Sequence, residues 1–78
     1  MQVRTIEVRS GEDFGRAIAE LRRRRNLTQD AAADKSGISK AYLSKIETGR
    51  TSALLNHVVR VLRRLGATIT VSFEDVTI

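Results

Sequence analysis

The sequence contains no cysteine, proline or tryptophan, and its only histidine is His57. The absence of cysteine excludes disulfide bonds, thiolate metal sites and a cysteine nucleophile. A single histidine excludes a multi-histidine metal site. The sequence also lacks a glycine-rich phosphate loop and a clustered carboxylate pair, so we expect no catalytic residue, no cofactor and no metal. No apolar run approaches the roughly 20 residues of a membrane span, and no signal-peptide core follows Met1.

Basic charge is the strongest compositional signal. Among 78 residues, 14 Lys and Arg stand against 9 Asp and Glu, which gives a formal net charge of +5. Eleven of the basic residues are arginine, the side chain suited to bidentate contacts with phosphate and base edges. A chain this short forms one domain that buries only about 60% of its unfolded surface, so oligomerisation is a natural further source of stability. The composition predicts a small, basic, cytoplasmic binding module.

Helix-capping residues and apolar spacing divide most of the chain into helices. Serine and threonine side chains stand immediately before each apolar-periodic segment, where they can accept hydrogen bonds from the first free N–H groups. Gly37 and Gly66 follow two of these segments, as residues able to adopt a left-handed conformation. The predicted helices, each with its N-cap, are 11–25 after Ser10, 29–36 after Thr28, 40–47 after Ser39, and a fourth from Ser52 to Leu65.

The apolar period changes from 3.6 to 2 after Gly66. Ile69, Val71 and Phe73 then fall on one face, with hydroxyl side chains on the other, which predicts a strand over residues 67–73. The first nine residues are rich in β-branched side chains and predict a short strand or an arm, which could add to the same sheet.

Residues 28–50 combine a short helix, a tight turn with Gly37 and a second short helix, the arrangement that places a helix in the DNA major groove. This stretch resembles the Xre/Cro-type DNA-binding domains of phage repressors. The resemblance covers roughly residues 12–66. The matching positions are Thr28, Gln29, Ala33, Gly37, Ile38, Ser39, Leu43, Ser44, Ile46, Glu47, Gly49 and Arg50.

The resemblance implies a mostly α fold, a compact four-helix helix-turn-helix domain at residues 10–66. The chain departs from the family pattern after Gly66, where a strand takes the place of a fifth helix. With its short length, this tail is most similar to that of the HipB-type antitoxins. In that subfamily the C-terminal strand pairs with its copy in a second subunit. We therefore expect an arm or strand at 1–9 and a dimerisation strand with its tail at 67–78, both usable in an intersubunit sheet.

The resemblance also implies residues for DNA recognition. Base readout is expected from Lys40, Ala41, Ser44 and Lys45, since lysine reaches guanine O6 and N7 and an alanine methyl can meet a thymine methyl. The alternative is a solvated charged face. The expected contacts to phosphate are Gln29, Ser39, Tyr42, Arg50 and Thr51. For Gln29 the alternative is plain solvation, and for Tyr42 it is core packing.

Four consecutive arginines at 22–25 sweep most of the way round a helix, so they cannot all face DNA. By the resemblance, Arg22 pairs with Glu47 and joins the first helix to the recognition helix. Arg23 is expected in solvent, and Arg25 is expected to meet carbonyl groups at the helix end.

The fourth helix carries more apolar surface than one domain core needs. Its expected core stripe is Leu54, Val58, Val61 and Leu65, which leaves other apolar side chains for a partner. A dimer would place two recognition helices about 34 Å apart on a palindromic operator. The predicted dimer contacts are Val59, Leu62, Ile69, Val71 and Phe73.

These features predict a dimeric, sequence-specific repressor that binds double-stranded DNA at the bacterial nucleoid. The likeness to HipB-type proteins implies an autoregulating antitoxin that binds a HipA-like kinase toxin. Two alternatives stay open: a repressor of stand-alone or phage type without a toxin, and a protein-interaction module without a specific DNA target. An enzyme is the least supported class.

Overall fold

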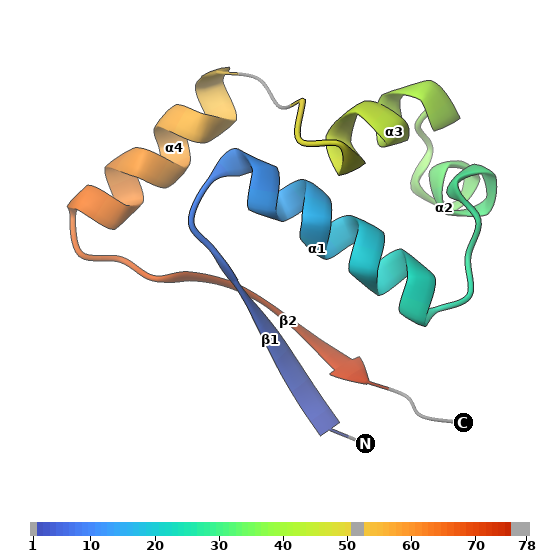
Figure 1. Cartoon of the computed structure of the whole chain (residues 1–78), viewed down its shortest axis with the longest axis horizontal. Helices are drawn as coiled ribbons and strands as arrows, with labels where there is room; N and C mark the ends of the chain where they lie inside the picture. The colour runs from blue at the N-terminus through green and yellow to red at the C-terminus, as the bar shows by residue number, and fades with distance from the viewer. Residues whose placement is uncertain (1, 51–52, 76–78) are drawn as a thin grey trace.

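The computed structural model describes residues 2–50 and 53–75, which form four helices and a two-stranded sheet. The predicted helices and C-terminal strand are confirmed, and the N-terminal segment is also a strand. The molecule is flat, with extents of 38 × 32 × 17 Å, and α1 lies across its middle between the other helices and the sheet (Figure 1). In chain order the elements are β1 (Gln2–Val8), α1 (Gly11–Arg24), α2 (Gln29–Ser36), α3 (Lys40–Glu47), α4 (Ala53–Arg64) and β2 (Ile69–Asp75).

The sheet joins the two ends of one chain. β1 and β2 are antiparallel, with Val8 opposite Ile69 and Arg4 opposite Phe73, so the N- and C-terminal segments lie side by side (Figure 1). The sequence predicted that the C-terminal strand pairs with its copy in a second subunit, whereas here its partner is β1 of the same chain. Each strand keeps one outer edge without a neighbour in the described part of the chain.

The core is small and consists of short side chains. α1 contacts α3, β1 and α4, and Ala17 and Ala19 are its buried apolar side chains. Three larger apolar residues of α1 recur at helical spacing, and of these Phe14 and Leu21 are half-buried and Ile18 is exposed, because the neighbours of α1 lie on several of its sides. The buried hydrophobic residues are Val8, Ala17, Ala19, Ala33, Leu43, Val59 and Phe73.

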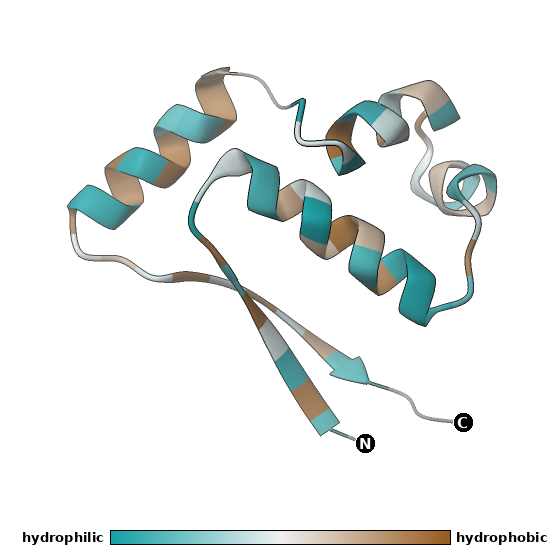
Figure 2. Ribbon diagram, in the orientation of Figure 1, coloured by the Kyte–Doolittle hydropathy of each residue, from teal (hydrophilic) through white to brown (hydrophobic). Residues whose placement is uncertain are grey.

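The side of α4 that packs against the core differs from the side predicted from the sequence. Val59, predicted as a dimer contact, is 2% exposed, so it belongs to the chain's own core. The cause is Asn56, one helical turn earlier, whose Oδ1 accepts a 2.8 Å hydrogen bond from the Gly11 amide at the start of α1. Figure 2 shows brown apolar residues recurring along α4. The predicted core stripe of Leu54, Val58, Val61 and Leu65 is instead exposed, at 46–80%.

Phe73 is likewise buried inside the chain rather than on a dimer surface. The guanidinium of Arg24 lies 5.7 Å from the centre of its ring, within cation–π range. Ile69 and Val71 are half-buried on the same face of β2, whereas Leu62 remains exposed on α4.

Gly15 allows α1 and α3 to approach each other closely. A Cβ at this position would overlap the Ile46 carbonyl group, which lies near the C-terminal end of α3. Any larger residue therefore pushes the two helices apart.

We expect Gly15→Ala to lower the free energy of unfolding by about 1–3 kcal/mol, as overpacking does elsewhere, although alanine is the better helix former by about 1 kcal/mol. Urea denaturation measures the change. Arg23→Ala, an exposed change on the same helix, is the control and should stay within about 0.5 kcal/mol. A stabilised Gly15→Ala protein would contradict the close approach.

Candidate nucleic-acid interface

Local hydrogen bonds define both helices of the helix-turn-helix. Thr28 Oγ1 accepts from the Ala31 amide and Ser39 Oγ accepts from the Tyr42 amide, each at 3.1 Å, so both residues are N-caps. Between the helices Gly37 has φ of +73°, the left-handed conformation in which glycine ends a helix without strain. Ser39 Oγ accepts the capping bond through a lone pair, so the hydrogen of its hydroxyl group is still able to donate to a phosphate oxygen.

The expected base-reading residues share one outward side of α3. Lys40, Ala41 and Lys45 are exposed and Ser44 is half-buried, whereas Leu43 between them is in the core. Lys40 Nζ lies 3.7 Å from Asp30 Oδ2, and both side chains are largely exposed, so this ion pair contributes little to stability and leaves the lysine free to move.

Three residues predicted to contact phosphate are described around this surface. Tyr42 is 57% exposed, which removes the alternative that it packs in the core. Arg50 is exposed beyond the end of α3, and no carboxylate in residues 2–50 or 53–75 lies within ion-pair distance of it. Gln29 stands at the first position of α2. Thr51, the remaining phosphate candidate, and Ser52, the predicted cap of α4, lie outside the described residues.

The Arg22 and Glu47 side chains, expected as a pair, form a bidentate contact. Arg22 Nε donates to Glu47 Oε2 at 2.8 Å and Arg22 Nη2 donates to Oε1 at 3.0 Å. Arg22 Nη1 also donates to the Leu27 carbonyl at 2.9 Å, and Gln29 Nε2 donates to Glu47 Oε1 at 3.1 Å. One carboxylate that is 5% exposed therefore connects α1, α2 and the end of α3.

This contact fixes the side chain of Gln29. The hydrogen bond between Gln29 and Glu47 was not predicted from the sequence, in which the two residues are 18 positions apart. A carboxamide nitrogen has two hydrogens, so one holds Glu47 while the other stays available at the start of α2.

The charge of Glu47 is favoured by its partners. The hydrogen bond from Arg22 is the largest influence and lowers the pKa of the Glu47 carboxyl below its usual range, with Gln29 acting in the same direction. Burial acts in the opposite direction and is outweighed. Glu47 is thus a carboxylate at neutral pH.

The remaining arginines of the 22–25 run also bond within the chain. Arg23 Nε donates to the Ala19 carbonyl. Arg24 donates to Glu20 and Asp75, both at 3.0 Å, and Arg25 Nη2 donates to the Glu74 carbonyl at 2.6 Å. Arg24 and Arg25 therefore tie the C-terminal end of α1 to β2, whereas Arg23 bonds within its own helix.

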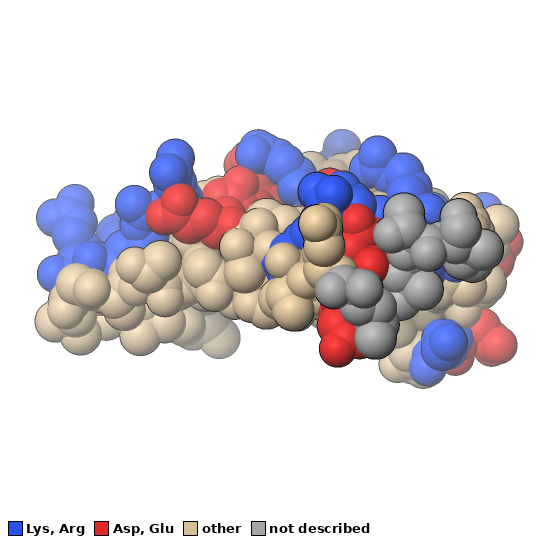
Figure 3. All heavy atoms as spheres, turned by 90° about the horizontal axis from the view of Figure 1, so that it is seen from below, with Lys and Arg blue, Asp and Glu red and all other residues tan. Residues whose placement is uncertain are grey.

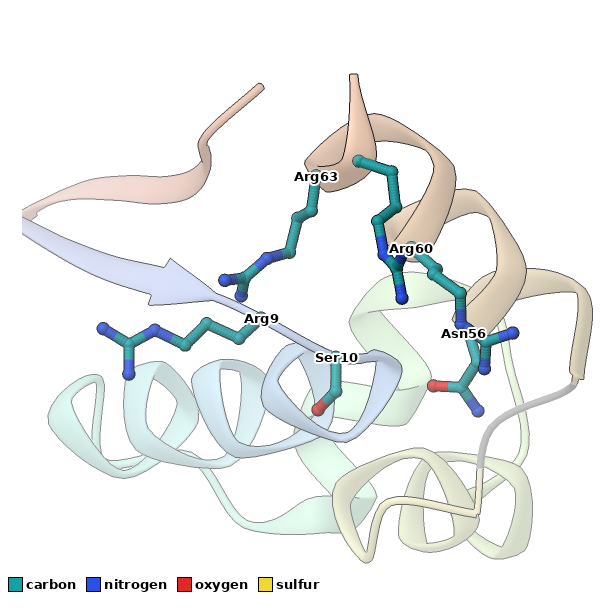
Figure 4. Close-up of a pocket in the computed structure, with 6 residues that line it drawn as sticks. Arg9, Ser10, Asn56, Arg60 and Arg63 are labelled. Atoms are coloured by element: carbon teal, nitrogen blue, oxygen red, sulfur yellow. The ribbon is translucent and has the colours of Figure 1, made fainter. Parts of the chain in front are cut away.

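The β1–α1 turn and α4 form a basic cluster that the sequence did not predict. Arg9 and Ser10 from the β1–α1 turn meet Asn56, Arg60, Arg63 and Arg64 of α4 around a pocket of about 320 Å³ (Figure 4). The spacing of the three arginines places them on one side of α4, but nothing in the sequence placed Arg9 against that side. In the described residues no group of histidine, cysteine and carboxylate side chains could hold a metal ion.

The sequence matches the family model of the helix-turn-helix domain over residues 13–71. The match covers most of the chain, so the chain belongs to this helix-turn-helix family. It includes α2, α3 and α4, α1 from Asp13 onward, and the start of β2. None of the helices in the described residues is long and apolar enough to cross a membrane.

Two relatives are similar over 62 residues, which is 80% of this chain. The HTH-type transcriptional regulator y4mF of Sinorhizobium fredii (strain NBRC 101917 / NGR234) is 29% identical, and the match covers 82% of its length. The HTH-type transcriptional regulator RghRB of Bacillus subtilis (strain 168) is 39% identical, and the match covers 42% of its length. No solved structure matches the chain.

Replacement of Glu47 by glutamine should lower the melting temperature at pH 7 by several degrees, because Arg22 loses its charged partner. The contribution of Glu47 is present above the carboxyl's ordinary pKa and is lost as the pH falls through its lowered folded-state pKa, where the unfolded chain binds more protons.

The difference in unfolding free energy between wild type and Glu47→Gln should therefore shrink between pH 7 and about pH 3. Urea denaturation at several pH values measures it. Glu12→Gln, which alters an exposed ion pair with Arg16, is the control. A difference independent of pH would show that the lost charge is not the cause.

Proposed function

We propose that the protein is a dimeric, sequence-specific DNA-binding transcriptional repressor. The observation that carries the proposal is the outward side of α3, where Lys40, Ala41 and Lys45 are exposed on a helix that the Arg22–Glu47 contact holds against α1. Both named relatives are HTH-type transcriptional regulators. The net charge of +5 adds a sequence-independent attraction to DNA.

In this proposal α3 enters the major groove, and Lys40, Ala41, Ser44 and Lys45 read base edges. Residues around the helix ends bind the backbone, since free amide groups and a positive helix dipole attract phosphate there. These positioning residues are Gln29, Ser39, Tyr42, Arg50 and Thr51. A regulator of this kind acts in the bacterial cytoplasm, on the nucleoid.

A second copy of the chain covers the exposed stripe of α4. Leu54, Val58, Val61 and Leu65 recur every three or four residues, as in helices that pair through one face. The radius of gyration of 13.4 Å exceeds the roughly 11.5 Å of a compact chain of this length. Pairing of α4 helices, with Leu62 at the edge of the contact and the free strand edges nearby, stabilises the small core and matches a palindromic operator.

The narrower role of an autoregulating antitoxin with a HipA-like kinase toxin rests on the resemblance to HipB-type proteins, in which a strand follows the helix-turn-helix domain as β2 does here. The strand pairing differs from that expected of HipB-type proteins, because β2 pairs with β1 of the same chain and not with its copy in a second subunit. Co-expression with a kinase-like protein encoded by a neighbouring reading frame tests it: a stable co-purifying complex supports the antitoxin, and two separately eluting proteins support a repressor without a toxin.

Fluorescence anisotropy on the protein's own promoter and on a scrambled duplex tests the main proposal. A preference of about 10³-fold or more for the promoter is expected of a specific regulator. Equal and steeply salt-dependent binding to both duplexes would contradict it and favour a protein-interaction module.

Within this proposal Lys45 and Arg50 have different tasks. Lys45→Ala should cost about 1–3 kcal/mol on the preferred site and reduce discrimination between operator variants. Arg50→Ala should weaken all duplexes alike and reduce the slope of log K against log salt by about 0.9. Anisotropy at several salt concentrations measures both. Equal effects of the two substitutions on every duplex would contradict the division between reading and positioning.

Val61→Asp should produce monomers that remain folded, because Val61 is exposed in the single chain. Truncation after Gly66 is a poorer test, since it removes Phe73 from the core. Analytical ultracentrifugation measures the mass and circular dichroism the fold. Arg63→Asp, an exposed change on the opposite side of the same helix, is the control and should remain dimeric. A Val61→Asp dimer as stable as wild type would exclude the α4 stripe as the interface.

A further inference from the structure

Four arginines surround one concave pocket at the junction of α4 and the β1–α1 turn. The pocket has a volume of about 320 Å³ and is lined by Arg9, Ser10, Asn56, Arg60, Arg63 and Arg64. In Figure 4 the Arg63 side chain extends from α4 toward Arg9, while Arg60 lies beside Asn56 on the preceding turns of the helix. Side chains from two elements 45 or more positions apart thus converge on the same space.

The positive charge of this pocket is largely uncompensated. Glu7 pairs with Arg9 at 2.9 Å, and Asp13 accepts a hydrogen bond from the Arg9 amide. Across residues 2–50 and 53–75, by contrast, no carboxylate lies within ion-pair distance of Arg60, Arg63 or Arg64. Every other arginine of the β1–α1 segment forms an ion pair or a hydrogen bond inside the chain. Like charges held together without counterions repel one another, so an anion that binds among them relieves this repulsion.

The pocket is separate from the candidate DNA interface. Its lining comes from the β1–α1 turn and α4, and none of it comes from α2 or α3. It is also distinct from the apolar stripe of α4. At the α4 end of the molecule, blue basic side chains gather on one side and uncharged surface on the other (Figure 3).

We infer that this pocket, which we name the arginine pocket, binds a small ligand with two or more linked phosphate groups. Guanidinium groups bind phosphate oxygens through two parallel hydrogen bonds. Two phosphate groups carry roughly three to four negative charges, which matches four arginines partly offset by Glu7. The volume is at the lower end of the roughly 300–1,000 Å³ of small-molecule sites. A peptide carboxylate delivers one charge per side chain and cannot supply this charge density in that space.

Binding also affects the fold, because the pocket spans the contact between α4 and the start of α1. That contact includes the Asn56–Gly11 hydrogen bond. A ligand held by Arg9 and Arg63 together bridges the two elements, so it stabilises the folded chain by mass action.

Isothermal titration calorimetry with inorganic tripolyphosphate, in DNA-free solution at constant ionic strength, tests the inference. We expect one saturable site per chain. Each of Arg60→Gln and Arg63→Gln should weaken binding about 10-fold or more, since each removes charged hydrogen bonds to phosphate. Both side chains are exposed and form no bond within the described chain, so the variants should fold normally and melt at or above the wild-type temperature without ligand.

Arg23→Gln is the matched control, because it removes the same charge from an exposed position on α1 outside the pocket. It should bind tripolyphosphate as wild type does. A nucleoside triphosphate in a parallel titration distinguishes two sources of linked phosphates: tighter binding assigns a nucleotide, and equal binding assigns free polyphosphate.

Three results would overturn the inference. The first is a thermal stabilisation by tripolyphosphate no larger than that by potassium chloride of equal ionic strength. The second is equal weakening in Arg63→Gln and Arg23→Gln, which would indicate general screening. The third is a loss of promoter affinity in Arg63→Gln with unchanged tripolyphosphate binding, which would place this arginine on the DNA backbone. Because the titration contains no DNA, its failure is independent of the proposed repressor function.

Discussion

The contact between Arg22 and Glu47 holds the helix-turn-helix together. A single carboxylate accepts hydrogen bonds from α1 and α2 while its own backbone belongs to the last residue of α3. Of the seven buried hydrophobic residues in the described part of the chain three are alanines, so core packing provides little shape to fix helix angles. The bidentate geometry of guanidinium and carboxylate defines a direction as well as a distance. The orientation of α3, and with it the exposed lysines, depends on this contact.

Because the core is small, α4 exposes two chemically different faces to solvent. Val59 and Asn56 attach the helix to the rest of the chain, and most of the other side chains of α4 are exposed. One exposed face is apolar and another is rich in arginine. A monomer of this size cannot bury all the apolar side chains that it carries. The apolar stripe is the surface on which we propose that a second copy packs, and the arginines beside it line the proposed site for a charged ligand.

The density of arginines along the sequence does not indicate which of them are free to bind a ligand. The run at 22–25 is the densest positive segment in the sequence, yet its side chains bond to carboxylates and carbonyls of the same chain. Arg50, Arg60, Arg63 and Arg64 are scattered along the sequence and have no such partners among the described residues. Their charge is available to a ligand because no carboxylate of the described residues lies within ion-pair distance of them.

The sequence by itself determined the helices, the side-chain caps of α2 and α3 and the alternation of β2, because these depend on neighbours within a few residues. Ser10 stands at the predicted N-cap position of α1, but its side chain forms no capping hydrogen bond. Thr28, Ser39 and Gly37 act locally and were predictable. The Arg22–Glu47 contact could be predicted only from the resemblance to a known family. Tertiary structure alone decided that β2 pairs with β1, that Gln29 bonds to Glu47 and that Arg9 meets Arg63 across the arginine pocket. It also decided which side of α4 faces inward. Apolar residues occupy more than half of that helix, so periodicity permits several orientations, and the Asn56–Gly11 hydrogen bond selects the one in which Val59 is buried.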